Sequence, residues 1–501
     1  MKKTLLLLAI LFSFSTFAQQ ISFSIGTQRI MKATGNQETM TFRIGNNNYV
    51  LYKKFSMSEG MLLHLEGFAG SDDAFLCSQD ISTPHEPNEI AIYEGFAALS
   101  NKMYLFRSVF KKEEKKCVLY AHDINEKGII STSGKEIAFI AAEKAMNSGN
   151  FIINASADGN SFVVLSEYPF VKETKEKFAV SVFNNTLEQQ WTKEIELVHD
   201  SRRGPSNNPI ISNSGIVYVM KKVEGPKNAD FYTCYQLADK GAKVKENTIE
   251  MEAPKKIVNY GSIIDESSND LIIAGYYTED GKVVLGGTGF KGTFITRISG
   301  STSEVKSKAT TAFDKTLSQM NVVSIHLLKG NIFLAGESRY ENNVATEQKD
   351  SKGFPIYNRE YVSNDVYVNI FDASGKQITN SILAKENKSI EDGGIANSVA
   401  SCIVGDQLML VYNGYQYKYD GQEHKIVGPA LAGIKIPVIQ FFGSDGSTGK
   451  TFAMIDTNVG GKKGTVYLFP NAFVPVNEKE FFFLSRGSGS GMISPVRMKL
   501  P

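Results

Sequence analysis

A short unit recurs along the whole chain: a strand-like run, a tight turn and a second strand-like run. The unit is clearest in residues 365–384, where Val366, Val368 and Ile370 occupy alternate positions and residues 372–375 supply Asp, Ser and Gly for the turn. Alternation with a period of two, interrupted by a turn of this composition, is typical of a β-hairpin. The chain is therefore expected to be built from β-hairpins.

Eight copies of the unit can be aligned on the second strand of the hairpin, at a loose spacing of about sixty residues. A further apolar run precedes each copy, and most copies are followed by a turn and another run, so that each unit holds four short strands. No helical periodicity separates the units. Such a repeat predicts an array in which each unit packs on its neighbours. The aligned segments begin near Met61, Cys117, Phe178, Phe231, Thr293, Val366, Pro437 and Met492.

Four short strands repeated eight times resemble the blades of a β-propeller. The resemblance implies an all-β fold: a single propeller domain over residues 19–501, with eight four-stranded blades or, as the alternative, seven. It is a resemblance to the architecture and to no particular family. WD40-type Trp-Asp and Gly-His pairs are missing, Gly-Gly pairs keep no kelch register, and the single tryptophan, Trp191, argues against quinone-cofactor propellers with repeated tryptophan motifs.

Eight complete blades require a strand from the other end of the chain. Residues 21–30 (ISFSIGTQRI) are strand-like and have no partner in the first unit, so they are predicted to complete the last blade and close the ring. Pro495 speaks against this arrangement, because proline is poorly tolerated in a strand that is paired on both sides. Seven blades with an irregular terminus therefore stays open.

Residues 1–18 have the pattern of a secretory signal peptide: Lys2 and Lys3, an apolar run, and small residues before a cleavage point at Ala18. We therefore expect a protein exported to the periplasm or the extracellular space, without a membrane span. The 54 Lys and Arg residues against 53 Asp and Glu residues give a net charge of +1. Nothing in this balance marks the chain as a nucleic-acid binder.

Cysteine and histidine give no sign of a metal site. The four cysteines lie far apart in strand-like runs and are interpreted as buried thiols, with one disulfide as the alternative. The six histidines show neither HxH nor HExxH spacing. His64 and His122 are expected to be half-buried strand residues, and His85 and His199 to lie in connections between units. Neither a metal nor a cofactor is predicted.

No catalytic residue can be assigned from the sequence, because no nucleophile elbow and no phosphate-binding loop occurs in a suitable context. Acidic residues such as 72–73, 279–280 and Asp420 could act as glycosidase acids if they faced each other across a substrate. In surface loops they are expected to be solvated instead. The mixed-charge run 111–116 is predicted to be an exposed hairpin tip.

The connections between second and third strands are long in three consecutive units, at residues 278–292, 338–365 and 414–436. In an up-and-down blade these connections share one face of the disc with the links between blades, so the three should be neighbours in space. Long loops tend to carry function, and tyrosine suits both sugar rings and protein partners. The predicted ligand-binding residues are Tyr340, Phe354, Tyr357, Tyr361, Tyr415, Tyr417 and Tyr419.

Together these features predict an exported, non-catalytic binding or scaffold protein, monomeric, with a loop face that engages a glycan or a protein partner at the cell envelope. The rival function is an enzyme, a hydrolase or lyase that acts on an extracellular polymer, since propellers host such activities and a fold does not determine a function. A central pocket with convergent acids, a histidine and a tyrosine would favour the enzyme. Aromatic loops over a plain channel would favour binding.

Overall fold

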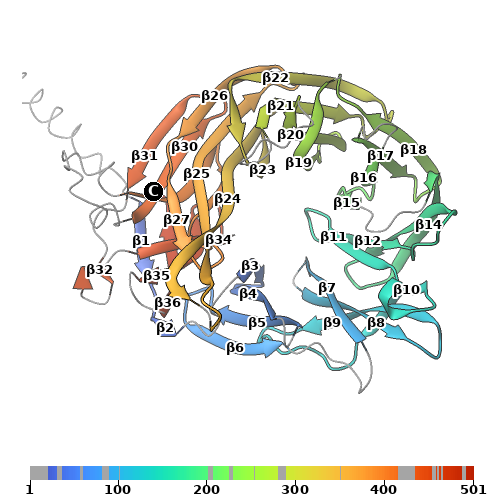
Figure 1. Cartoon of the computed structure of the whole chain (residues 1–501), viewed down its shortest axis with the longest axis horizontal. Coiled ribbons are helices and arrows are strands. Elements are labelled where there is room, and N and C mark those ends of the chain that lie inside the picture. Colours follow the sequence, from blue (N-terminus) through green and yellow to red (C-terminus); the bar gives the residue numbers. More distant parts are fainter. Residues whose placement is uncertain are drawn as a thin grey trace, which may run out of the picture.

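Eight antiparallel sheets stand side by side in a ring in the computed structural model (Figure 1). Each sheet is one blade, with its first strand toward the ring axis and its last strand at the rim. A short pair, β32 (Asn458–Val459) with β33 (Lys462–Lys463), and one 3-10 turn, η1 (Ala145–Asn147), are the other regular elements of the described residues. The structure describes residues 21–30, 37–56, 60–81, 90–100, 102–200, 207–224, 230–252, 254–279, 289–349, 351–415, 435–453, 458–459, 462–463, 466–487 and 492–501.

The first four blades follow the chain in order, each with four strands. Blade one consists of β3 (Gln37–Ile44), β4 (Asn47–Ser56), β5 (Gly60–Phe68) and β6 (Phe75–Ile81). Blade two consists of β7 (Ile90–Leu99), β8 (Lys102–Lys111), β9 (Lys116–Ile124) and β10 (Lys135–Ala141). Blade three consists of β11 (Asn150–Ala155), β12 (Ser161–Glu167), β13 (Lys175–Asn184) and β14 (Gln189–Asp200). Blade four consists of β15 (Asn207–Ile211), β16 (Val217–Glu224), β17 (Asp230–Ala238) and β18 (Lys243–Ile249).

The last four blades include the two sheets that have an extra short strand. Blade five consists of β19 (Lys256–Asp265), β20 (Asp270–Thr278), β21 (Gly289–Ile298) and β22 (Val305–Ser318). Blade six consists of β23 (Met320–Leu328), β24 (Asn331–Lys349), β25 (Pro355–Phe371), β26 (Gln377–Leu383) and β27 (Asn387–Ile390). Blade seven consists of β28 (Val399–Val404), β29 (Gln407–Tyr415), β30 (Lys435–Gly443) and β31 (Thr448–Ala453). Blade eight consists of β34 (Val466–Pro475), β35 (Glu480–Gly487), β36 (Met492–Lys499), β1 (Ser22–Ile25) and β2 (Arg29–Ile30).

The eight aligned segments of the sequence all form the third strand of a blade, which confirms the repeat and the propeller architecture. The hairpin in blade six turns at residues 372–375, as predicted. Asp372 accepts hydrogen bonds from the backbone N–H of Ser374 (2.9 Å) and of Lys376 (3.0 Å). Gly375 has φ +88°, a conformation that glycine adopts without strain. The charged run 111–116 is a hairpin tip, where Glu114 pairs with two lysines.

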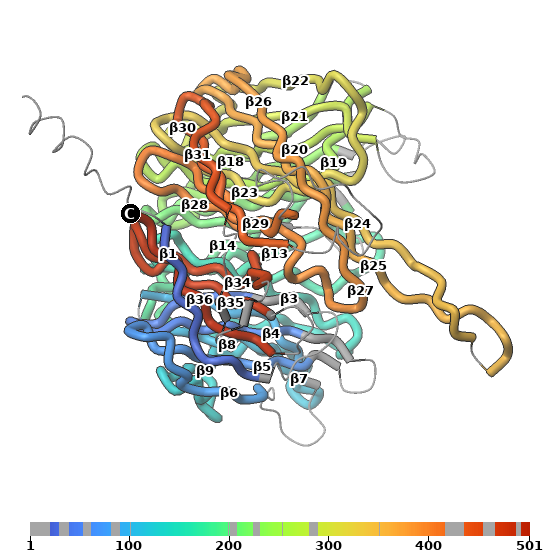
Figure 2. The backbone as a smooth tube through the Cα atoms, turned by 90° about the vertical axis from the view of Figure 1, so that its left-hand side faces the viewer, coloured from blue at the N-terminus to red at the C-terminus, as the bar shows by residue number. Residues whose placement is uncertain are grey.

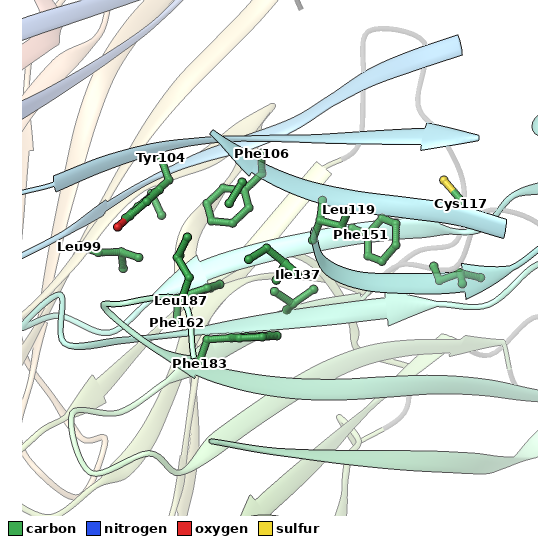
Figure 3. Packing of buried hydrophobic residues seen from close by; sticks show 14 residues of the cluster. Leu99, Tyr104, Phe106, Cys117, Leu119, Ile137, Phe151, Phe162, Phe183 and Leu187 are labelled. Carbon is green, nitrogen blue, oxygen red and sulfur yellow. The ribbon is translucent and has the colours of Figure 1, made fainter. Parts of the chain in front are cut away.

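Blades pack face to face through apolar side chains, and this explains the burial pattern of the strands. Every residue of β20 is buried, because the second strand of a blade has a neighbouring blade against each of its two faces. The rim strand β22 alternates between exposed and partly buried residues instead. Between blades two and three, Phe162 lies 5.6 Å from Phe106 and 5.0 Å from Phe183, measured between ring centroids (Figure 3). Aromatic contacts of this kind supply much of the packing energy.

The N-terminal strand closes the ring, as the sequence predicted. β1 pairs antiparallel with β36 from Ser22–Lys499 to Ile25–Val496, and β2 pairs with the same strand at Arg29–Ile493. Pro495 lies between these two ladders, where the N-terminal segment is irregular. Its carbonyl accepts a hydrogen bond from Gly26 (2.8 Å), and the missing N–H of the proline therefore interrupts no ladder on that side. A Cβ at Gly26 would lie 2.6 Å from the Pro495 ring, so only glycine fits there.

A buried ion pair joins the last blade to the first and corrects one expectation. Asp73 is not solvated: it is 7% exposed, and Arg497 of β36 contacts it through Nη2 at 2.5 Å and Nε at 3.1 Å. The partners are 424 residues apart in the chain. Two other expectations also need correction. His64 and His122 are buried, not half-buried, and His199 lies within β14 and not in a connection between units.

Candidate functional site

The enlarged connection of blade six is not a loop but a two-stranded arm. The pairing of β24 with β25 continues beyond the blade, from Arg339–Ser363 to Lys349–Pro355. The arm projects well beyond the disc, on the face that carries the connections between second and third strands (Figure 2). We call this side the loop face. The corresponding connections of blades five and seven lie for the most part outside the described residues, so that their predicted neighbourhood stays a prediction.

The aromatic residues predicted to bind a ligand occupy different environments. On the arm, Phe354 is 64% and Tyr357 is 58% exposed, whereas Tyr340 is partly buried. Tyr361 is 4% exposed at the base of the arm, where β27 pairs with β25. Tyr415 ends β29 and is partly buried. The remaining two, Tyr417 and Tyr419, lie outside the described residues.

A pocket of about 350 Å³ opens on the loop face beside the base of the arm. Three blades contribute to it: β27 and the following link from blade six, the facing ends of β29 and β30 from blade seven, and β34 and β35 from blade eight. Of the predicted residues that the structure describes, Tyr415 alone lines this pocket. The lining consists of Lys388, Ser389, Asp392, Ile395, Ala396, Asn397, Tyr415, Lys435, Tyr467, Phe469 and Arg486.

Strand register places cations beside aromatic rings on two walls of the pocket. Tyr415 and Lys435 are cross-strand partners, and the Lys435 ammonium lies 5.5 Å from the centroid of the Tyr415 ring. Tyr467 and Arg486 are cross-strand partners in the next blade. Both pairs lie at strand ends that face the same side of the disc. The pocket therefore combines apolar ring faces with positive charge, a combination suited to a ring-shaped ligand that carries negative charge.

Burial and a nearby positive charge lower the pKa of Lys435. Desolvation is the main cause that lowers the pKa of its ammonium, from 10.5 to about 8, and the nearby charge of Lys385 lowers it further, while Asp392 and Glu386 oppose the shift. Oδ1 of Asp392 already accepts hydrogen bonds from Ser389 Oγ (2.5 Å) and from the Gly394 N–H (2.8 Å). This carboxylate is thus engaged in holding the link between blades six and seven.

A buried polar cluster fixes the floor of the pocket. Lys385 forms an ion pair with Glu337 and donates a hydrogen bond to Ser363 Oγ (2.8 Å); its side chain has no exposed surface. Its ammonium also donates to the carbonyl oxygen of Asn397, which lines the pocket. Buried charges are tolerated when they are paired and hydrogen-bonded, and such clusters hold their surroundings in one geometry.

Asn413 of β29 connects this floor to blade eight. Its side chain donates to the carbonyl oxygens of Ala396 (2.7 Å) and Leu468 (2.8 Å) and accepts from the Leu468 N–H (3.0 Å). Ala396 lines the pocket, and Leu468 lies in β34 between two lining residues. The walls from three blades are thereby held relative to one another before any ligand binds.

The histidines and acids that the sequence singled out, as far as the structure describes them, are not among the residues that line this pocket. His64 contacts Asp80 (2.7 Å) and Ser78 (3.0 Å) within blade one. His326 hydrogen-bonds to Ser401 (2.9 Å), and burial lowers its pKa to about 4. Within the described part of the chain, no three His, Cys, Asp or Glu side chains are placed to hold a metal ion. Asp280, Asp420, His85 and His424 lie outside the described residues.

Sequence reasoning missed Lys435, Arg486 and Tyr467 because it concentrated on the interior of long connections. The residues that line the pocket stand instead at the ends of strands, next to those connections. A signal was present: Lys435 directly precedes the apolar third strand of its unit, and Arg486 directly follows the apolar second strand of the next unit. Both positions face the loop side in every up-and-down blade.

The fold and the pocket define the protein as an eight-bladed β-propeller closed by its N-terminal strand, with a cationic and aromatic pocket on one face. Within the described residues, no helix is long and apolar enough to cross a membrane. No protein-family model and no curated protein sequence matches the chain.

Solved structures with similar folds include both enzymes and non-enzymatic domains. The β-propeller domain of the trilobed protease from Pyrococcus furiosus is 13% identical, with 85% of this chain and all 100% of that chain covered and a TM-score of 0.35. The WD40 domain of SCAP from fission yeast is 8% identical, with 95% and 98% covered and a TM-score of 0.38. The polysaccharide lyase Uly1 is 10% identical, with 81% and 89% covered and a TM-score of 0.35. Similarities this low leave the function to be argued from the residues of this chain.

Proposed function

We propose that this protein is an exported binding protein whose loop face, over blades six to eight, engages a glycan or a protein partner. The observation that carries the proposal is the pocket between these blades, in which Tyr415 and Tyr467 stand beside Lys435 and Arg486. Pockets that combine apolar ring faces with a few fixed polar groups are the usual form of ligand sites. The signal-like pattern of residues 1–18 supports export. The proposal includes that the protein acts at the cell envelope as a monomer with one propeller domain.

Binding is favoured over catalysis by the chemistry of the lining. Hydrolysis of a glycosidic bond generally needs two carboxyl groups that flank the substrate. Among the described residues that line the pocket, Asp392 is the one carboxylate, and its Oδ1 already accepts two hydrogen bonds. The fixed floor and the ring faces of the partly buried Tyr415 and Tyr467, by contrast, are features that a binding site needs.

The test compares Tyr415→Ala with wild-type protein on a glycan array and in pull-down from cell-envelope extracts. Tyr415 lines the pocket at the end of a strand, so its truncation should leave the fold intact. Loss of a real contact residue should weaken a ligand by about 1 kcal/mol or more, roughly fivefold. Phe139→Ala is the matched control, because Phe139 is a 61% exposed aromatic residue of blade two.

Retention of every ligand by Tyr415→Ala, or equal losses in Tyr415→Ala and Phe139→Ala, would contradict the proposal. Release of shortened products from a polymer by the wild-type protein would support the rival enzyme instead.

A further inference from the structure

The pocket on the loop face has a marked imbalance of charge. Among the described residues that line it, Lys388, Lys435 and Arg486 are cations and Asp392 is the one carboxylate, while Glu386 pairs with Lys388 (3.5 Å) from outside the lining. The whole chain is almost neutral, with a net charge of +1, so the excess of positive charge is a local feature. A concave site lined by one sign of charge concentrates ligands of the opposite sign.

The volume of the pocket and its apolar lining residues restrict the class of ligand that it can bind. A volume of about 350 Å³ lies at the small end of the range for ligand pockets, about 300 to 1,000 Å³. The partly buried rings of Tyr415 and Tyr467 provide apolar surface within the same space, and the buried Phe469 and Ile395 also belong to the lining. A long unbranched anion would leave these rings unused, whereas a neutral sugar would make no use of the positive charge.

We propose that this pocket binds an acidic sugar residue of a glycan, with the pyranose ring against Tyr415 and its carboxylate near Lys435 and Arg486. This inference rests on the proposed function and specifies its ligand. Lysine supplies a compact positive charge, and arginine can bind a carboxylate through two N–H groups at once. An anionic ligand would also stabilise the partly desolvated ammonium of Lys435 in its charged form.

Several charged and titratable groups surround the Lys435 ammonium, and they determine the pH dependence. Charges that lower its pKa come from the buried Lys385, and those that raise it come from Asp392 and Glu386. The pocket itself adds Lys388 of β27, Tyr415 of β29, Tyr467 of β34 and Arg486 of β35. Since the pKa of Lys435 is about 8, the lysine is charged below that pH and loses its proton above it. Affinity for a carboxylate should therefore be constant between about pH 5 and 7, where the carboxylate is ionised and the lysine is charged, and fall as the pH rises past 8.

The first experiment compares acidic oligosaccharides with their neutral counterparts. Tetrasaccharides that contain galacturonate, glucuronate or mannuronate are titrated by calorimetry, each beside the same tetrasaccharide with its carboxyl groups reduced to alcohols. At least one acid should bind roughly tenfold or more tightly than its reduced counterpart, because a hydrogen-bonded ion pair is lost on reduction. A sulfated oligosaccharide and inorganic phosphate in parallel titrations show whether any anion suffices.

The second experiment uses variants of the pocket. Lys435→Met should clearly reduce the preference for the acid over the reduced sugar, with Arg486 alone left beside the carboxylate, whereas Lys127→Met, on an exposed turn of blade two, should leave it unchanged. Lys435→Arg should keep the preference and remove the decline in affinity between pH 8 and 9.5, because arginine stays charged over that range. Melting curves of each variant establish that the fold is kept, and the arginine variant tests the charge even if the methionine variant fails to fold.

Three negative outcomes are distinguishable. Equal binding of acidic and reduced sugars, with both lost in Tyr415→Ala, would overturn the acidic-sugar inference and leave the proposed function in place. Absence of binding to every acidic and neutral sugar overturns the inference, and if Tyr415→Ala also loses no protein partner the proposed function fails as well. Tight binding of inorganic phosphate at the same site, with no gain from a sugar ring, would likewise refute the assignment to a glycan.

Discussion

Glu94 lies on β7, the innermost strand of blade two, and its ionised carboxylate should lower the free energy of unfolding at neutral pH. Glu94→Gln should remove this penalty, because glutamine does not ionise. Desolvation is the cause that raises the pKa of the Glu94 carboxyl from 4.5 to about 7, and the hydrogen bond that Ser108 Oγ donates to it only partly opposes the shift. An acid whose pKa is higher in the folded state favours folding only while it is protonated. Its contribution is therefore fully present below pH 4.5 and is lost as the pH rises through 7.

The size of the effect follows from the shift. The pKa of Glu94 rises from 4.5 in the unfolded chain to about 7 in the folded protein, and each pKa unit corresponds to about 1.36 kcal/mol. Ionised Glu94 therefore lowers the free energy of unfolding by about 3 kcal/mol above pH 8. At pH 5 the same group costs less than about 1 kcal/mol, so the change between pH 5 and pH 8 is about 2 to 3 kcal/mol. For a chain of this length the unfolding entropy is roughly 1 kcal/mol per degree, and the corresponding shift in Tm is about 2 to 3 °C.

The assay measures Tm of the wild type and of Glu94→Gln at pH 5, 6, 7 and 8. Glutamine keeps the shape of the side chain and can still accept a hydrogen bond from Ser108, but it does not ionise. At pH 5 the variant should melt close to the wild type. The difference in Tm between variant and wild type should then grow by about 2 to 3 °C from pH 5 to pH 8, with the variant the more stable. Glu113→Gln, on the exposed hairpin tip of the same blade, is the control and should show no such trend. A gap that stays constant with pH, or narrows toward pH 8, would refute the reasoning.

Three further predictions concern ring closure and buried charge. Deletion of residues 22–30 should lower Tm clearly in calorimetry, because it uncovers the edge of the last blade. Lys385→Met should lower the free energy of unfolding in denaturant titrations by about 3 to 5 kcal/mol, since it leaves the buried Glu337 carboxylate without its partner, and a second change, Glu337→Gln, should recover most of the loss. For His64, burial lowers the pKa, but Glu66 and Asp80 more than compensate and raise it overall. The advantage in Tm of the wild type over His64→Gln should therefore be largest below pH 6.5 and shrink as the pH rises to 9.

The sequence was sufficient to predict the repeat and the closure of the ring, because both depend on local patterns. A third strand such as residues 437–443 reads as apolar on both faces, since neighbouring blades cover it from both sides. The N-terminal strand could be assigned for a similar reason: its pattern required a partner, and the last unit lacked a fourth strand. Even Pro495 proved compatible once the irregular segment at residues 26–28 was opposite to it.

Two kinds of feature could not be predicted. The arm of residues 339–363 shows no clean alternation, because both of its faces meet water, and it was taken for a loop. The environment of Asp73 depends on Arg497, which approaches only when the ring has closed. The pocket could not be predicted for the same reason, because Lys435 and Arg486 belong to different blades. Local patterns determine strands, whereas pairs across blades depend on how the blades are placed.

The position of the pocket connects ligand binding to ring closure. One wall consists of Tyr467 and Arg486 in β34 and β35 of blade eight, and the rim of that blade is completed by β1. The apolar residues Phe23 and Ile25 of the N-terminal segment pack against the same core cluster that joins blades seven and eight. Removal of the N-terminal strand therefore loosens the support of one wall while Tyr415 and Lys435, in blade seven, keep theirs. A closed ring is thus a requirement both for stability and for the geometry that would hold a ligand between the last three blades.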